Sequence, residues 1–111
     1  MKIAIPSHDE KLCLHFGHCE VFVIVDVDER NTILRMENKV PPPHEPGLLP
    51  KWLREMGVDV VIAGGMGQRA QNLFAENSIK VVVGAPPETL KTIIEKFLNG
   101  TLETGANTCD H

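Results

Sequence analysis

The sequence is poor in aromatic side chains: its 111 residues include no tyrosine, one tryptophan and four phenylalanines. A protein that stacks nucleic-acid bases on an aromatic surface is therefore not expected. Lysine and arginine number 11 against 15 aspartates and glutamates, which gives a net charge of −4 and leaves no basic stripe for phosphate contacts. We expect no nucleic-acid partner.

Long apolar runs are also missing. Those present, such as residues 58–63, are far shorter than the ~20 residues that a membrane-spanning helix needs, and the first residues lack the apolar core of a signal peptide. Three cysteines, an odd number, fit poorly with a disulfide framework and suggest thiols in a reducing compartment. We expect one domain over residues 1–111, cytoplasmic and without a membrane partner.

Hydrophobic periodicity predicts the element order β-β-β-α-β-α-β-α. The predicted strands are residues 2–5 (stopped by Pro6), 21–27, 32–39, 58–63 and 79–83. The predicted helices are residues 48–56 before Gly57, a short helix striped by Ala70, Leu73 and Phe74 and closed by Asn77, and residues 90–98 before Gly100. The later strand–helix–strand unit requires a right-handed parallel crossover, whereas the early hairpin is antiparallel. The fold class is therefore α/β, with a mixed five-stranded sheet and helices on both faces.

The hairpin at residues 21–39 is expected at one side of this sheet and residues 79–83 at the other, with residues 2–5 and 58–63 central. The loop after Ile5 and the turn after Ala63 then emerge together, at the carboxyl ends of two parallel strands. Open α/β sheets bind their ligands at such an edge.

A loop of seven residues concentrates metal-binding side chains: Cys13, His15, His18 and Cys19. Neutral imidazole and thiolate bind zinc, copper and iron–sulfur species. The spacing matches no standard zinc pattern, because adjacent His18 and Cys19 seldom point at one tetrahedral centre. The alternative is that the cysteines pack inward beside surface histidines. Gly17 would allow a turn that brings the backbone near a ligand.

A second candidate is the turn that contains Gly64, Gly65 and Gly67 around Met66, where a buried strand becomes a helix. Free N–H groups and the positive end of the helix dipole would face a bulky anion there. The turn also fits a relaxed dinucleotide fingerprint, but the acidic residue expected after the next strand is missing. Alternatively, the glycines serve only a tight turn. An exposed Met66 thioether would be a soft contact for a metal.

Two further segments offer metal ligands. Cys109 and His111 form a Cys-x-His triplet at the chain end, which can complete a metal site or be frayed and inert. His44 lies in a proline-rich loop. Catalysis finds little support, since neither serine, Ser7 or Ser78, is set in a nucleophile elbow. We expect no enzyme activity.

Several short segments are specific in their order and spacing: His15-Phe16-Gly17 before a strand, Phe22-Val23-Ile24-Val25-Asp26 as that strand, Gly57-Val58-Asp59 before the next, Gly64-Gly65-Met66-Gly67 with Ala70, and Cys109-Asp110-His111. With these segments the chain resembles the dinitrogenase iron–molybdenum cofactor-binding family, which includes NifX, NifY and the C-terminal domain of NifB. The resemblance covers nearly the whole chain.

The resemblance implies a three-layer α/β/α, ribonuclease H-like fold and a non-catalytic carrier or chaperone for an anionic metal–sulfur cluster in nitrogen fixation-related cofactor biosynthesis. The cluster would be an iron–molybdenum cofactor precursor, another thiometallate or an iron–sulfur species, and donor or acceptor proteins would be its partners. The expected lining is Gly64, Gly65, Met66, Gly67, His15, Phe16 and Gly17, and the expected metal ligands are His15 and Met66, then His18 and Cys19, then Cys13, His44, Cys109 and His111. A nucleotide- or phosphate-binding module and a small regulatory interaction domain remain as alternatives.

Overall fold

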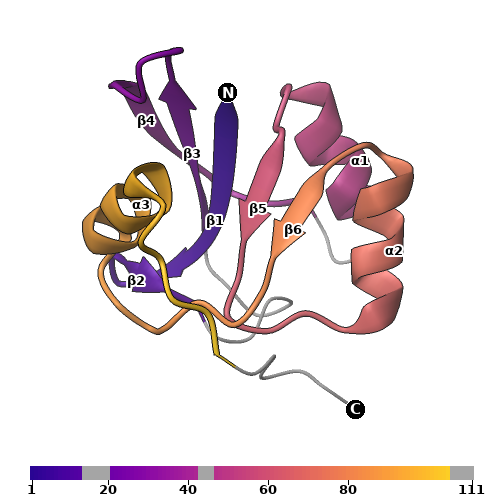
Figure 1. Cartoon of the computed structure of the whole chain (residues 1–111). Helices are drawn as coiled ribbons and strands as arrows, with labels where there is room; N and C mark the ends of the chain where they lie inside the picture. Colours follow the sequence, from indigo (N-terminus) through magenta and orange to yellow (C-terminus); the bar gives the residue numbers. More distant parts are fainter. Residues whose placement is uncertain (14–20, 43–46, 106–111) are drawn as a thin grey trace.

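The computed structural model describes residues 1–13, 21–42 and 47–105, which form one mixed sheet flanked by three helices (Figure 1). The strands are β1 (Lys2–His8), β2 (Lys11–Leu12), β3 (Val21–Val27), β4 (Ile33–Lys39), β5 (Val60–Ile62) and β6 (Lys80–Val82). The helices are α1 (Leu48–Glu55), α2 (Gln68–Glu76) and α3 (Leu90–Asn99).

The strands lie in the order β4-β3-β1-β5-β6, and β2 pairs with β1 outside this path. β1, β3 and β4 are antiparallel neighbours, whereas β1, β5 and β6 run parallel, with Ala4 opposite Val61 and Val61 opposite Val81. The predicted arrangement is confirmed: the β3–β4 hairpin lies at one side, β6 at the other, and β1 and β5 are central. The carboxyl ends of β1, β5 and β6 therefore share one edge of the sheet.

Alternating side chains of β1 divide the core between the two faces of the sheet. Ile3 and Ile5 pack in one cluster with Ile93 of α3. Ala4 points the other way, into a cluster that includes Leu53 of α1 and Phe74 of α2. Figure 1 shows the same division, with α3 on one face and α1 and α2 on the other. The expected α/β/α layers are thus confirmed.

The expectation that the first strand stops at Pro6 is wrong, because β1 continues to His8. Proline lacks an N–H, so it is tolerated only where no ladder bond is needed. The Cys13 N–H donates to the Pro6 carbonyl (2.9 Å), so the polar backbone groups of Pro6 face away from β3. The parallel ladder to β5 covers only Ile3 and Ala4. The missing N–H therefore costs no hydrogen bond in the ladders to β3 and β5, and on the side of β2 Pro6 lies just before the pairing that begins at Ser7.

The sheet has six strands rather than the expected five, because the chain folds back after β1 into the two-residue strand β2. The connecting residues Asp9 and Glu10 have φ values of 51° and 63°. Successive left-handed residues match the right-handed twist of a two-residue hairpin, but such turns normally use Asn-Gly or Asp-Gly. The Asp-Glu pair gave no sequence signal for this strand.

The predicted helix ends are confirmed. Gly57 follows α1 with φ 84°, and Gly100 caps α3 with φ 73°, conformations that favour glycine. Asn77 caps α2, and its side-chain amide donates to the Leu73 carbonyl (2.8 Å). None of the helices in the described ranges is long and apolar enough to cross a membrane.

Candidate functional site

The turn between β5 and α2 is fixed by backbone hydrogen bonds to the segment that follows β6. The Ala63 N–H donates to the Val82 carbonyl (2.8 Å), and the Gly84 N–H donates to the Gly64 carbonyl (3.0 Å). These bonds extend the parallel pairing of β5 and β6 past the ends of both strands. The chain is thus held as far as Gly64 and then turns toward α2 at the carboxyl edge of the sheet.

The N-terminus of α2 begins at Gly67, which has an extended backbone (φ −64°, ψ 155°) and gives the helix no side-chain cap. The first turn contains no acidic residue and carries the exposed Arg69. A Cβ added at Gly67 would meet no heavy atom within 4 Å. The N-terminus of α2 therefore borders open space at Gly67 and carries an exposed arginine in its first turn, and an uncapped helix N-terminus favours an anion.

Met66 is fully buried, so the expectation of an exposed thioether is wrong. Its side chain belongs to the cluster on the α1 and α2 face, which also contains Phe74 of α2. The Gln71 side-chain amide donates to the Met66 carbonyl (2.9 Å) and ties the turn to the helix. An apolar side chain at the start of a helix gains more by packing under that helix than by facing water.

The segment with the predicted metal ligands leaves and rejoins the sheet at the same edge as the glycine turn. At one end of the segment, Cys13 is half-buried and its N–H donates a hydrogen bond to the carbonyl of Pro6 in β1. At the other end, Val21 of β3 lies opposite Ser7 of β1. The intervening His15, Phe16, Gly17, His18 and Cys19 lie outside the described residues, as do His44, Cys109 and His111. Their role as ligands stays a prediction. No three His, Cys, Asp or Glu side chains gather into a metal-binding group within residues 1–13, 21–42 and 47–105.

The C-terminal segment after α3 also reaches this edge. The Gly105 N–H donates to the Gly84 carbonyl (2.7 Å), and Leu102 packs against the α3-side core. A row of backbone hydrogen bonds thus links Gly64, Gly84 and Gly105. The sequence pattern singled out Gly64 alone of these three, because the other two belong to no local motif.

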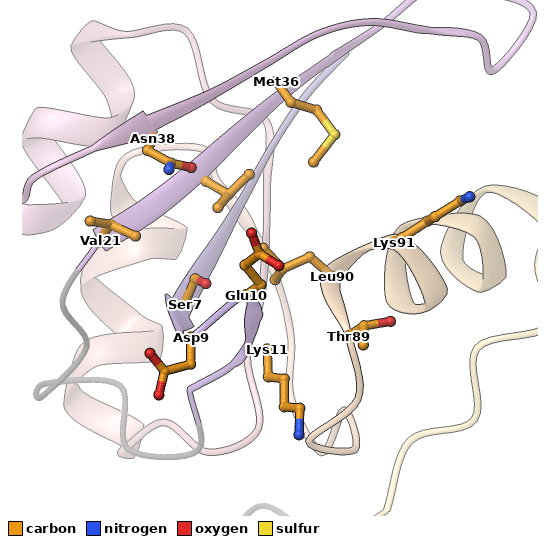
Figure 2. Close-up of a pocket in the computed structure, with 11 residues that line it drawn as sticks. Ser7, Asp9, Glu10, Lys11, Val21, Met36, Asn38, Thr89, Leu90 and Lys91 are labelled. Carbon is orange, nitrogen blue, oxygen red and sulfur yellow. The ribbon is translucent and has the colours of Figure 1, made fainter.

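Two cavities lie outside the glycine turn itself, although Gly84, which is hydrogen-bonded to Gly64, lines one of them. One, of about 590 Å³, lies between β4 and the N-terminus of α3; Figure 2 shows the side chains of Glu10, Met36 and Asn38 around it. The other, of about 530 Å³, lies between the segment that follows β6 and the C-terminal segment. Neither is lined by Gly64, Gly65, Met66 or Gly67, and sequence reasoning identified neither.

Comparison with known proteins agrees with this geometry. Residues 1–100 match the family described as "Dinitrogenase iron-molybdenum cofactor". The chain is 32% identical over 107 residues to the uncharacterized protein MJ0580 of Methanocaldococcus jannaschii, a match that covers 93% of this chain and 90% of that protein. The chain belongs to the dinitrogenase iron–molybdenum cofactor family.

Solved structures share the fold. The crystal structure of PH0822 superposes with a TM-score of 0.86 at 30% identity, covering 95% of this chain and 96% of that one. The apo form of the orange protein from Desulfovibrio gigas superposes with a TM-score of 0.73 at 22% identity, covering 96% and 94% respectively. The family match and the three-layer fold together identify the chain as a domain of the dinitrogenase iron–molybdenum cofactor family.

Proposed function

We propose that this chain binds an anionic metal–sulfur cluster and carries it between proteins during cofactor assembly, without catalysing a reaction. The observation that supports the proposal is the uncapped N-terminus of α2, which faces open space at Gly67 in a protein of the cofactor family. The cluster class is an iron–molybdenum cofactor precursor, a related thiometallate or an iron–sulfur species.

The proposed site has two parts with different chemistry. Backbone N–H groups at Gly67 and in the first turn of α2, with Arg69, supply positive potential for the cluster's negative charge, and Gly65, which is buried, shapes the turn before them. His15 is the first proposed metal ligand, followed by His18 and Cys19, because imidazole and thiolate suit iron and other soft metals. A few soft ligands beside a helix N-terminus hold a cluster that must later be transferred, whereas a closed four-ligand cage would retain it.

The remaining candidates have distinct places in the proposal. Cys13, His44, Cys109 and His111 are further ligands from the loop, the proline-rich segment and the tail. Met66 is fully buried in the core cluster on the α1 and α2 face, so we assign its side chain to packing that supports the turn. A donor and an acceptor of the cluster are the proposed protein partners.

The test is anaerobic reconstitution. Purified protein is incubated with ferrous iron and sulfide, and separately with tetrathiomolybdate, then desalted and assayed for metal, sulfide and visible absorbance. We expect a coloured protein, with cluster retention reduced in His15→Ala, His18→Ala and Cys19→Ser. Thr92→Ala, on α3, is the control.

Protonation of a ligating imidazole would release the metal. Cluster retention is therefore expected to fall as the pH drops through roughly 6.5, the ordinary pKa of a histidine side chain. Equal retention in all the loop variants would contradict these ligands and direct the search to Cys109→Ser and His44→Ala. A colourless, metal-free product in both reconstitutions would contradict cluster binding itself. Phosphate or nucleotide binding measured with that product would then support the alternative use of the glycine turn.

A further inference from the structure

The exposed apolar side chains of this protein concentrate on one strand. In the described part of the chain, the large hydrophobic side chains left exposed are Met1, Ile33, Leu34, Met36 and Val40. All but Met1 belong to β4 or follow it directly. Leu34 and Met36 are 65% and 48% exposed, in contrast to the neighbouring strand β3, where Val23 and Val25 are buried. β4 therefore exposes apolar surface that its own fold leaves uncovered.

β4 is also an edge strand. It pairs with β3 alone among the described strands, so the backbone groups on its other side are open to a further strand. Its pairing is regular from Arg35 to Lys39, and the irregularity in the ladder lies opposite Asp26 and Val27, at the hairpin end. Natural proteins usually shorten or cover such edges. This one is seven residues long.

We propose that β4 pairs antiparallel with β4 of a second copy of this chain, about a two-fold axis at Met36, to form one continuous sheet. Met36 then lies opposite Met36 of the second copy. Arg35 of each copy lies opposite Glu37 of the other, so the pairing forms two cross-strand ion pairs of opposite charge. The strand is thus complementary to itself.

The charges of β4 select this register. Within one copy, Glu37 already pairs with Arg35 and with Lys39 (3.6 Å) along the same face of the strand. A two-fold axis at Arg35 or at Glu37 would place like charges directly opposite each other, which destabilises a sheet. The axis at Met36 instead alternates positive and negative groups across the new pair.

A second register is compatible with charge but not with the backbone. An axis at Asn38 would place Glu37 opposite Lys39 of the other copy. It would also draw Pro41 and Pro42 into the ladder, and proline cannot donate a ladder hydrogen bond. The axis at Met36 ends the pairing at residues 33 and 39 and leaves both prolines outside.

The same pairing acts on the cavity between β4 and α3. Met36 and Asn38 line that cavity from the edge strand, as Figure 2 shows. Asn38 would lie opposite Leu34 of the second copy, so the added strand would lengthen the apolar surface beside the cavity. This contact would cover the outer flank of Leu34 and Met36, part of the apolar surface that the single chain exposes.

Sedimentation velocity over a concentration series in 0.15 M salt tests the proposal. A single strand pair buries little surface, so we expect a weak dimer that forms between about 10 µM and 1 mM. Arg35→Glu or Glu37→Arg alone should raise the dissociation constant about tenfold or more, because each turns both cross-strand pairs into repulsive ones. The double variant Arg35→Glu/Glu37→Arg should restore the parent value to within about threefold, because it exchanges the charges and keeps their complementarity.

Lys39→Glu is the matched control. It reverses a charge on the same face of β4, but in the proposed register Lys39 lies opposite the uncharged Ile33 of the second copy. It should leave the dimer unchanged, and circular dichroism should show all four variants folded. A parent protein that stays monomeric to about 1 mM overturns the proposal. A double variant that does not regain the parent dissociation constant also overturns it. The third contrary outcome is a Lys39→Glu variant that no longer dimerises while Arg35→Glu still does, because that result would place the axis at Asn38.

Discussion

Gly84 and Gly105 lie so close together that the backbone of Gly105 leaves no room for a side chain on Gly84. A Cβ on Gly84 would lie 2.2 Å from the carbonyl oxygen of Gly105, and the Gly105 N–H donates to the Gly84 carbonyl at 2.7 Å. Gly84 also has φ +83°, the left-handed region that favours glycine. This contact fastens the C-terminal segment to the edge of the sheet that holds the proposed cluster site.

Gly84→Ala should therefore lower the free energy of unfolding by at least about 2 kcal/mol, because a strained φ adds to a clash with backbone that cannot move aside. Urea denaturation measures the change. Gly105→Ala is the matched control: its φ is not left-handed, and a Cβ there would meet only the Gly84 oxygen, at 3.9 Å. If both variants lose the same stability, the close approach is not the cause.

Much of the fold could be predicted because the determinants are local or periodic. The β-branched run of β3 and the apolar stripe of α3 specify their own type of element, and Gly57 and Gly100 mark the helix ends. The order of the sheet followed from connection rules, since parallel strands need a crossover and adjacent antiparallel strands a short turn. The shared edge of β1 and β5 was predicted on this basis.

The errors arose where tertiary contacts decide the local outcome. Pro6 reads as a strand end, but its carbonyl accepts a hydrogen bond from Cys13 and faces away from β3, so the pairing of β1 with β3 needs no N–H from it. Met66 reads as exposed because it stands between glycines, yet α2 covers it. The contact between Gly84 and Gly105 joins residues far apart in sequence, so no local pattern contains it.

The turn of the β1–β2 hairpin gives a second stability prediction. Glu10 has φ 63°, a left-handed backbone conformation that glycine adopts without strain. The same conformation is unfavourable for glutamate, which is not among the side chains, such as Asn and Asp, that tolerate it best. Glu10→Gly should raise the free energy of unfolding by about 0.5 to 1 kcal/mol, as measured in urea. Glu29→Gly, in the β3–β4 turn without a left-handed φ, should be neutral or destabilising. Equal gains in both would trace the effect to the lost charge instead.

Burial of Met66 separates a core role from a ligand role. Met66→Ala should destabilise the protein by about 2 to 5 kcal/mol through the cavity it leaves. Met66→Leu nearly conserves the volume and should cost less than about 1.5 kcal/mol. Because the thioether is buried in the core on the α1 and α2 face, the leucine variant should retain the reconstituted cluster as well as the parent does. Loss of the cluster from a stably folded Met66→Leu protein would reinstate the sulfur as a ligand.

Substitutions at Gly67, at the start of α2, should stabilise the folded protein while weakening its binding of an anion. Gly67 occupies the N-cap with an extended backbone and open space around it, so a capping side chain fits without strain. Gly67→Ser and Gly67→Asp should each raise the free energy of unfolding by a few tenths of a kcal/mol, with aspartate gaining up to about 0.5 kcal/mol more from the helix dipole. Both side chains would occupy the N–H groups that we assign to the anion, and aspartate adds a negative charge. Tetrathiomolybdate binding, followed by visible absorbance, should therefore weaken in the serine variant and weaken further in the aspartate variant. Two stabilised variants that bind as tightly as the parent would show that the anion sits elsewhere.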